Sequence, residues 1–271
     1  MAAFEGAGAT KGQVTAWALN VEKWQPDEAT VQALLETVQP EERTRIEKFR
    51  FDVDRRRALA GRVMIRNLIA KEFAVQNADI ELARSDKGKP ELVKPNPGKF
   101  SFNLSHHGSW VVLVSHKSRV IGVDVVKYEH PRGSRSLEDF FTTMSKSFTP
   151  EEWAYIRNGD ETGDLLGDEH LKRFYKEWSL KEAYIKAIGV GIGFGLQRAS
   201  FEPREDDTAQ LVLDGKVNEE FTFQITHLDE NHCAAVALEE SNDTTEEPVK
   251  IIWTHLDYPT GPGESEEASS C

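Results

Sequence analysis

A carboxylate and an amine stand four residues apart in the segment EWSLKEAYIKAIG, residues 177–189: Glu182 and Lys186. In a helix, residues four apart lie on the same face. The two groups therefore form either a solvated ion pair or a carboxylate and an ammonium that are held together for chemistry. Apolar residues of the same segment predict a buried stripe close to that face, formed by Trp178, Ala183, Ile185 and Ile188.

A second carboxylate, Asp124, interrupts the β-branched run VIGVDVV at residues 120–126 and runs against the propensity of strands. One explanation is an aspartate that caps a turn at the end of a strand. The alternative is a hard oxygen ligand for Mg²⁺, which binds through one or two carboxylates together with water and substrate phosphate. In that case Glu182 is the candidate for the second carboxylate.

Groups that suit phosphate occur in the first half of the chain. The segment RSDKGKP, residues 84–90, offers three cations and a glycine that lets the backbone approach an anion, although solvated turns have the same composition. The run NLSHHG, residues 103–108, adds a hydroxyl and imidazoles, with a packed histidine as the alternative. Arg45 adds a cation that equally suits a surface. Together, these groups predict a diphosphate site with cations on one wall and metal ligands on the other.

The elements that must position these groups follow from hydrophobic patterning. Residues 84–90 are expected to form an exposed loop because glycine and proline punctuate them. Residues 239–250 are acidic and rich in threonine. The patterns predict helices at residues 26–37 and 54–73 and strands at residues 14–21, 101–105, 110–115, 120–126 and 251–256.

The two halves of the chain resemble each other. Residues Phe102–His106 match Phe223–His227 in character at an offset of 121, and Ala60–Arg66 aligns with Leu180–Lys186 at an offset of 120. Chance similarity of short apolar patterns is the alternative. A true repeat makes each half an α+β unit with a helix laid on an antiparallel sheet, and predicts a ligand site in the crevice between the halves.

Composition excludes several classes of protein. The net charge of -13, from 46 acidic and 33 basic residues, argues against nucleic acid or anionic membrane as a partner. The cysteines, Cys233 and Cys271, are too few for a disulfide framework. No apolar segment approaches the roughly 20 residues that span a bilayer, and the first residues do not form a signal peptide. We therefore expect a cytosolic chain.

Three signatures together resemble one family. They are KFSFNLSHHGSW, then IGVD at Ile121–Asp124, then WSLKEAYIK at Trp178–Lys186. The chain resembles the 4'-phosphopantetheinyl transferases of the large, surfactin-synthetase-activating type, whose hallmark motifs are (V/I)G(V/I)D and (F/W)(S/C/T)xKE(A/S)xxK. Further stretches, PEERTRIEKF, AGRVMIRNL, KGKP and AIGVGIGFGLQR, are similar to animal members that serve aminoadipate-semialdehyde dehydrogenase. The resemblance extends from about Val14 to Leu238.

The resemblance implies a duplicated α+β fold: a pseudo-twofold pair of α/β halves with antiparallel sheets and the active site at their interface. Residues 1–119 would form the N-terminal half, which contacts the nucleotide and phosphates of coenzyme A. Residues 120–257 would form the C-terminal half, which carries the metal ligands and catalytic residues. Residues 258–271 are expected to be a disordered tail.

The resemblance also implies the ligands. Mg²⁺ would be bound by Asp124 and Glu182. Bacterial members often have a further acidic ligand at the position of Val126, so a water is expected to complete the shell here. Coenzyme A would be bound by Arg45, Arg84, Ser85, Asp86, Lys87, Gly88, Lys89, Asn103, Leu104, Ser105 and His106, and by Asp124, Glu182 and Lys186 at its phosphates.

The implied reaction is the Mg²⁺-dependent transfer of 4'-phosphopantetheine from coenzyme A to a serine of an apo carrier domain, with release of adenosine 3',5'-bisphosphate. The carrier would belong to a fatty acid synthase or to an enzyme like aminoadipate-semialdehyde dehydrogenase, and the transferase would be a monomer. Glu182 and Lys186 are the expected catalytic residues, with Glu182 or a metal-bound water as the proton acceptor. A Mg²⁺-dependent phosphohydrolase and a binding module without turnover are the alternatives.

Overall fold

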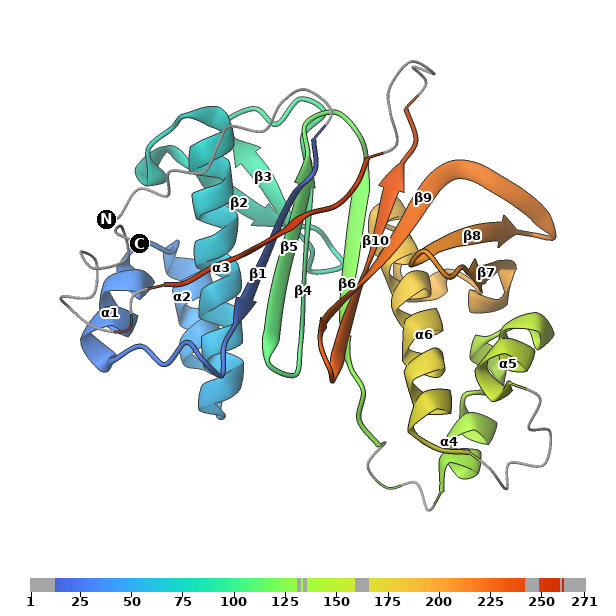
Figure 1. Cartoon of the computed structure of the whole chain (residues 1–271). Helices are drawn as coiled ribbons and strands as arrows, with labels where there is room; N and C mark the ends of the chain where they lie inside the picture. The colour runs from blue at the N-terminus through green and yellow to red at the C-terminus, as the bar shows by residue number, and fades with distance from the viewer. Residues whose placement is uncertain are drawn as a thin grey trace, which may run out of the picture. The chain divides into compact units, whose positions relative to one another are not determined.

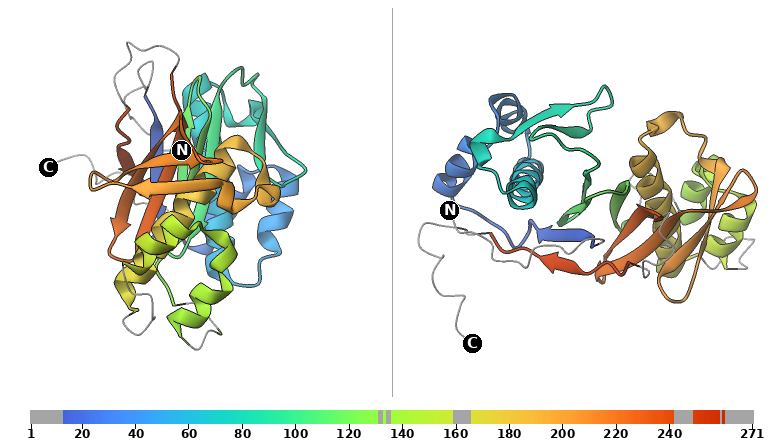
Figure 2. Two further views of the ribbon diagram at one scale, coloured as in Figure 1. Left: turned by 90° about the vertical axis from the view of Figure 1, so that its right-hand side faces the viewer. Right: turned by 90° about the horizontal axis from the view of Figure 1, so that it is seen from above.

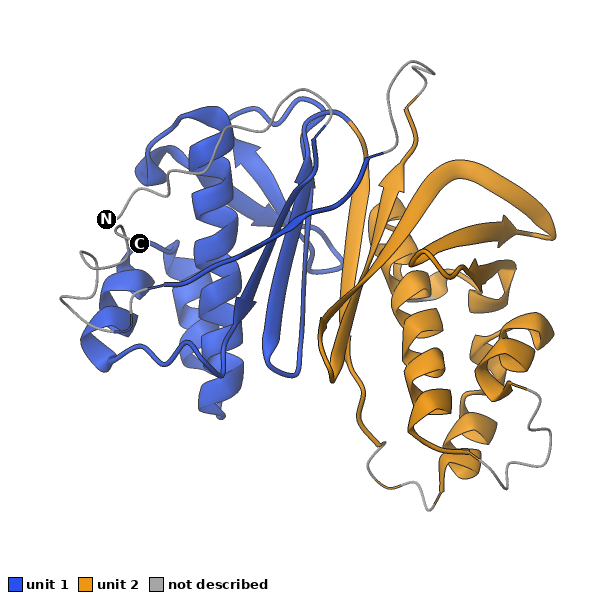
Figure 3. Cartoon of the chain, in the orientation of Figure 1, with its two compact units in different colours: residues 1–118, 248–271 blue, residues 119–247 orange. Residues whose placement is uncertain are grey.

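The computed structural model describes residues 13–130, 133, 136–158, 166–241, 249–258 and 260. The chain divides into two compact units (Figure 3). Unit 1 comprises residues 1–118 and 248–271, and unit 2 comprises residues 119–247. Both units combine helices with sheets whose neighbouring strands are mostly antiparallel, so the predicted α+β class is confirmed.

Unit 1 is built on a four-stranded sheet in the order β11-β1-β5-β4 (Figure 1). Strand β5 pairs with β1 on one side and with β4 on the other, both antiparallel, whereas β11 runs parallel to β1. A separate hairpin consists of β2 and β3. The strands are β1 (Thr15–Asn20), β2 (Glu81–Arg84), β3 (Pro90–Lys94), β4 (Ser101–His107), β5 (Trp110–His116) and β11 (Trp253–His255).

The long helix of unit 1, α3 (Asp52–Phe73), packs against this sheet (Figure 2). Its apolar residues recur at helical spacing, so that Leu59, Val63 and Leu68 all reach the core that Val111 of β5 also enters. The sequence predicts this helix at residues 54–73, within two residues of its observed bounds. Two shorter helices, α1 (Glu28–Glu36) and α2 (Pro40–Glu47), precede it, and a 3₁₀ turn at Asn77–Asp79 follows.

Unit 2 is built on a five-stranded antiparallel sheet in the order β6-β10-β9-β8-β7. Helix α6 (Asp168–Ile188) packs on β6 and β10, and α5 (Pro150–Arg157) packs on α6. Helix α4 (Leu137–Thr143) completes the unit with 3₁₀ turns at Ser145–Ser147, Gly191–Gly193 and Leu196–Arg198. The strands are β6 (Ile121–Lys127), β7 (Ala199–Pro203), β8 (Thr208–Leu213), β9 (Lys216–Asp229) and β10 (His232–Glu239).

The two units share one topology, which confirms the predicted repeat. In each unit a first strand is followed by helices, and a later hairpin places its second strand beside the first strand. The resulting order is β1-β5-β4 in unit 1 and β6-β10-β9 in unit 2, all antiparallel. The registers also correspond, because Asn103 pairs with Val114 in unit 1 and Gln224 pairs with Val236 in unit 2.

The end of the chain contributes to unit 1. The sequence analysis grouped residues 248–257 with the C-terminal half, but β11 adds to the edge of the unit 1 sheet, where β1 offers unpaired backbone groups. Tyr258, expected in the disordered tail, is packed 6.0 Å from Trp24 between ring centroids and receives a 3.2 Å hydrogen bond from Asn67. The remainder of the expected tail, Pro259 and residues 261–271, lies outside the described residues.

Two composition-based expectations can be compared with the structure. Within the described ranges, no helix has both the length and the apolar character that crossing a bilayer requires. Cys233 is a buried free thiol in β10. Cys271 lies outside the described residues.

Candidate active site

Three residues that the sequence singles out come together within unit 2. Asp124 lies on β6, and Glu182 and Lys186 lie on the neighbouring helix α6. The Lys186 ammonium is 2.5 Å from Oδ1 of Asp124. Asp124 is only 10% exposed at its side chain, whereas Lys186 is 30% exposed and can reach solvent. Lys186 thus binds a carboxylate of the adjacent strand, a contact that helical spacing alone does not predict.

Gly122 explains why helix and strand approach closely enough for this cluster. A Cβ atom at position 122 would lie 2.5 Å from the backbone nitrogen of Ala187 and closer still to the carbonyl oxygen of Ala183. No larger residue fits beside the α6 backbone without displacing the helix. The glycine of the IGVD motif therefore sets the distance between β6 and α6, and with it the separation of Asp124 from Glu182 and Lys186.

The electrostatics of the cluster favour a bound cation. Burial raises the pKa of Glu182 above its usual range, and the negative charge of Asp124 raises it further, while Lys186 acts in the opposite direction. Two carboxylates and one ammonium leave one net negative charge when both acids are ionised. A divalent cation between the carboxylates would remove their repulsion.

The donor set is compatible with Mg²⁺, but it is sparse. Across the described part of the chain, no group of three or more His, Cys, Asp or Glu side chains is arranged to hold a metal. Asp124 and Glu182 supply two carboxylates, the number that Mg²⁺ commonly takes from a protein. Val126, two residues after Asp124, is buried and belongs to the apolar core of unit 2.

Lys181, the neighbour of Glu182, has a different role. Its side chain is 1% exposed, and its ammonium lies 2.8 Å from Oε2 of Glu152 and donates to the carbonyl of Leu196 at 2.9 Å. Glu152 also accepts the backbone N–H of Thr149 at 2.8 Å, which caps α5. Lys181 therefore ties α6 to α5 and to the segment before β7.

The loop expected at residues 84–90 lies in unit 1 and connects β2, which ends at Arg84, to β3, which begins at Pro90. It is an ordered turn, in which the N–H of Gly88 donates to Ser85 at 2.8 Å and the N–H of Ser85 donates to Lys89 at 3.0 Å. Asp86, Lys87 and Gly88 are exposed, and Lys89 is half-buried. Burial lowers the pKa of Lys89, partly offset by Glu91. Arg84 is engaged at the base of the loop with Glu42 and with the carbonyl of Gly88.

The second expected segment, on β4, is divided by the pleat of the strand. Asn103 and Ser105 lie on one face and are buried, whereas Leu104 and His106 lie on the other. Leu104 packs against the core beneath α3, so its side chain is a packing residue. A ligand on one face of β4 can contact at most half of these four side chains, and it can reach Leu104 only through its backbone.

Arg45 lies on α2, a helix that the sequence analysis did not predict because only Ile46 among its eight residues is buried. Arg45 itself is exposed. It stands one turn after Glu42 and close enough to Arg62 of α3 that its charge lowers the pKa of the Arg62 guanidinium, after the larger effect of burial. The residues expected to bind coenzyme A thus lie on several elements of unit 1, except Asp124, Glu182 and Lys186, which lie in unit 2 with the expected metal ligands.

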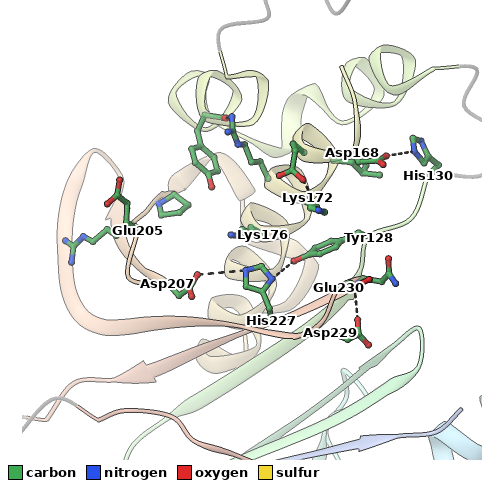
Figure 4. Close-up of a pocket in the computed structure, with 17 residues that line it drawn as sticks. Tyr128, His130, Asp168, Lys172, Lys176, Glu205, Asp207, His227, Asp229 and Glu230 are labelled. Carbon is green, nitrogen blue, oxygen red and sulfur yellow. Dashed lines mark hydrogen bonds and ion pairs between the residues drawn. The ribbon is translucent and has the colours of Figure 1, made fainter. Parts of the chain in front are cut away.

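Unit 2 also contains an open cavity of about 1310 Å³ that includes none of the predicted site residues (Figure 4). The cavity lies beside the N-terminal half of α6 and the end of β9. Sequence reasoning missed it because its lining comes from separate segments that share no motif. The lining residues are Tyr128, His130, Tyr155, Asp168, Glu169, Leu171, Lys172, Arg173, Lys176, Pro203, Arg204, Glu205, Asp207, His227, Asp229, Glu230 and Asn231.

Much of the charge in this cavity is paired internally (Figure 4). Lys172 donates to Glu169 at 2.8 Å, and His130 lies 3.2 Å from Asp168. His227 joins Tyr128 at 3.2 Å, and burial together with the charge of Lys176 lowers the pKa of His227. Asp207, 4.0 Å from Nε2 of His227, opposes this shift. The lining has six carboxylates and four Lys or Arg side chains, so its charge disfavours an anionic substrate.

The family of the chain follows from comparison with known proteins. A family model described as "4'-phosphopantetheinyl transferase, N-terminal" matches residues 22–118. A second, the "4'-phosphopantetheinyl transferase superfamily", matches residues 120–237. Together with the relatives described next, these matches show that the chain belongs to the 4'-phosphopantetheinyl transferase superfamily, which confirms the resemblance seen in the sequence.

Two curated relatives align over most of their length. The chain is 55% identical over 244 residues to a phosphopantetheinyl transferase of Thraustochytrium sp., covering 90% of this chain and 84% of that protein. It is 39% identical over 247 residues to L-aminoadipate-semialdehyde dehydrogenase-phosphopantetheinyl transferase of Mus musculus, covering 86% and 77%. A crystal structure of a Bacillus anthracis holo-(acyl-carrier-protein) synthase aligns at 20% identity with a TM-score of 0.34, over 46% of this chain and 98% of that one, which is too weak to add to the assignment.

Proposed function

We propose that the protein transfers the 4'-phosphopantetheine group of coenzyme A to a serine hydroxyl of an apo carrier domain and releases adenosine 3',5'-bisphosphate. This is the activity of a holo-[acyl-carrier-protein] synthase. The observation that carries the proposal is the cluster of Asp124, Glu182 and Lys186, because its members belong to the two signature motifs of the superfamily and come together in the fold.

Asp124 and Glu182 would hold Mg²⁺ at this cluster. Burial and, to a smaller extent, the charge of Asp124 raise the pKa of Glu182, and a cation between the two carboxylates would offset both effects. When bound, the ion would neutralise negative charge on the diphosphate of coenzyme A. Since Val126 is buried and apolar, oxygens of water and substrate would complete the coordination shell.

Lys186 would bind a phosphate oxygen of the substrate. Its side chain is partly exposed, so the ammonium can turn from Asp124 towards an anion. Cleavage of the diphosphate bond places negative charge on the leaving bisphosphate, and a positioned ammonium stabilises that charge in the transition state. Lys186 therefore acts as an electrostatic group that does not itself transfer a proton.

Glu182 would accept the proton of the serine. A serine hydroxyl is almost entirely neutral at pH 7, so its attack requires a proton acceptor in the transition state. Glu182 lies in the cluster with Asp124 and Lys186, so its carboxylate would accept this proton directly or through a metal-bound water that it orders. The transfer rate is then expected to fall at acid pH as Glu182 becomes protonated.

Unit 1 would bind the nucleotide and the phosphates of coenzyme A. Support comes from the cations of Arg45, Lys87 and Lys89, since positively charged side chains suit phosphate. Arg84 would shape the loop. The remaining proposed contacts are those of Ser85, Asp86, Gly88, Asn103 and Ser105, together with the backbone groups of Leu104 and His106.

The proposed partners are apo carrier domains, those of a fatty acid synthase and of an aminoadipate-semialdehyde dehydrogenase-like enzyme. The name of the mouse relative supports the second. With a net charge of -13, neither nucleic acid nor an anionic membrane is proposed as a partner, and the protein would act as a cytosolic monomer.

The test is to incubate the protein with coenzyme A, Mg²⁺ and a purified apo carrier domain and then to measure the mass of the carrier. A gain of one phosphopantetheine group on the expected serine supports transfer. Release of adenosine 3',5'-bisphosphate without a gain in carrier mass supports the phosphohydrolase alternative. Binding of coenzyme A with neither product identifies a module without turnover.

A further inference from the structure

We propose that Glu42 is a positioning residue for coenzyme A, which fixes the phosphate loop Ser85–Lys89 and the helix that carries Arg45 in one arrangement. The inference rests on the proposed function, because it assumes that these elements bind coenzyme A. Glu42 itself would not touch the substrate. All the groups involved lie within unit 1.

The contact between Glu42 and Arg84 joins α2 to the start of the loop. Nε of Arg84 lies 2.6 Å from Oε1 of Glu42, and Nη2 lies 2.7 Å from Oε2, which is a bidentate pair. The third nitrogen, Nη1, donates to the carbonyl of Gly88 at 2.8 Å. One guanidinium therefore holds both the α2 carboxylate and the far side of the loop.

Hydrogen bonds within the loop hold it in one conformation. The contacts of Arg84 with Glu42 and Gly88 can therefore position the loop as a unit. Besides its two backbone bonds, the N–H of Lys89 donates to the hydroxyl of Ser85 at 3.1 Å. Gly88 has a φ of +79°, a conformation that L side chains rarely adopt. A shift of Arg84 would therefore displace the N–H groups of the loop together with Lys87 and Lys89.

A second arginine fixes Glu42 from the opposite side. Arg62 of α3 bonds to Oε2 of Glu42, and the side chains of Arg62 and Glu42 are only 12% and 13% exposed. Burial alone would raise the pKa of Glu42, but the hydrogen bond from Arg84 and the charge of Arg62 outweigh it and lower the pKa to about 2. Glu42 is therefore ionised at every working pH.

Charge and position predict opposite effects of Glu42→Gln on the affinity for coenzyme A. One carboxylate and two guanidinium groups carry a net charge of +1, and loss of the carboxylate would raise it to +2. If charge alone governed binding, Glu42→Gln would strengthen the binding of the anionic coenzyme A. If Glu42 positions the loop, the same substitution weakens binding, because the loop and Arg45 lose their common support.

The experiment compares Glu42→Gln with Glu41→Gln, which removes the same charge from the exposed neighbour on α2. For Glu42→Gln we expect the KM and the Kd for coenzyme A to rise by about 10-fold or more, since misplacement by about 1 Å can cost up to about 10²-fold. The kcat at saturating coenzyme A should stay within about twofold, because the chemical groups of unit 2 are unchanged. Glu41→Gln should leave both constants near those of the wild type.

Arg84→Lys keeps the charge but not the bidentate contact, and it provides a second route if Glu42→Gln folds poorly. It should raise the KM for coenzyme A to a similar extent, and the double variant should be no worse than either single one. Unchanged or tighter coenzyme A binding in both variants, or an equal loss in Glu41→Gln, would overturn the inference. A wild-type protein that neither binds coenzyme A nor transfers it would instead refute the proposed function.

Discussion

Helices α3 and α6 occupy the same place in two units of one topology, yet they present opposite chemistry. The offset of 120 residues that relates the halves sets Arg62 against Glu182 and Arg66 against Lys186. In α3, Arg66 is buried and bonds to Asn77, and the side chain of Arg62, 12% exposed, bonds to Glu42. In α6 the corresponding residues are partly accessible and stand beside Asp124.

The first strands of the two units also differ in their charged residues. Strand β6 carries Asp124, whereas β1 reads TAWALN and has no charged residue. The shared scaffold of one helix on a three-strand meander therefore does not create a site by itself. What distinguishes unit 2 is a carboxylate in the strand and a second one on the helix, while unit 1 uses its helix to support a loop of cations.

Glu182→Gln should produce the largest effect and tests the assignment of chemistry to unit 2. The substitution keeps the shape of the side chain but removes its charge, so carrier modification should fall by about 10²-fold or more if Glu182 is a base or a metal ligand. The rate of mass gain on the carrier measures this loss. Turnover near that of the wild type would refute the role of Glu182.

Lys186→Met and Arg66→Met test the difference between α6 and α3, because the two residues occupy corresponding positions of these helices. Lys186→Met should lower the transfer rate with little change in thermal stability, because the ammonium is partly exposed. Arg66→Met removes buried charged hydrogen bonds, including the 2.6 Å bond to Asn77, and should cost roughly 1.5–3 kcal/mol of stability. Urea unfolding and steady-state kinetics of both variants provide the two readouts. A loss of stability in Lys186→Met, with a loss of transfer but not of stability in Arg66→Met, would contradict the assignment of chemistry to α6 and of support to α3.

Gly122→Ala and Gly61→Ala compare the close approach of helix and sheet in the two units. A Cβ at Gly122 meets the α6 backbone, so Gly122→Ala should lose about 1–3 kcal/mol of stability and most of its transfer activity. A Cβ at Gly61 meets the end of the Leu104 side chain, which can turn aside, while alanine favours the helix. Thermal melts should show a clear loss only for Gly122→Ala. Equal losses would mean that both helices are constrained alike.

Glu177→Gln should produce the smallest effect, a change in how the free energy of unfolding depends on pH. The carboxyl of Glu177 is fully buried, and neither oxygen has a hydrogen-bond partner within the described ranges. Burial, with the charge of Glu152, raises its pKa well above the usual value, although Lys181 opposes this. A raised pKa means that the folded state holds the proton more tightly, so the contribution of Glu177 to stability is greatest below its unfolded pKa and is lost as the pH rises.

The amide of Glu177→Gln does not titrate, so the stability of the variant relative to the wild type should increase between pH 5 and pH 8. Denaturant unfolding across this range, with the exposed Glu169→Gln as a control, measures the trend. A difference that stays constant with pH would show that Glu177 titrates normally.

The sequence predicted those parts of the fold that depend on local pattern. Helix α3 and strands β1, β4, β5 and β6 follow from apolar periodicity, and the repeat followed from matched patterns in the two halves. Helix α2 was missed because it buries a single residue. The first turns of α6, before residue 177, were missed because Leu171 and Phe174, although buried, form too short an apolar pattern to indicate a helix.

The candidate site was predicted residue by residue, but its contacts were not. Asp124 and Lys186 are separated by 62 positions and Glu42 and Arg84 by 42, so neither contact has a local signature. For the same reason, the contact of Lys181 with Glu152, which α5 supplies, has no signature in the sequence around Glu182. Long-range pairing of this kind is set by the fold as a whole.

The most direct test of the account is to measure coenzyme A binding and carrier modification in the same preparations of wild type and Asp124→Ala, as Mg²⁺ is titrated. We predict that Asp124→Ala still binds coenzyme A through unit 1 but transfers phosphopantetheine poorly, with a much weaker response to Mg²⁺. An unchanged Mg²⁺ titration and wild-type transfer in Asp124→Ala would contradict the claim that the Asp124–Glu182–Lys186 cluster is the site of transfer.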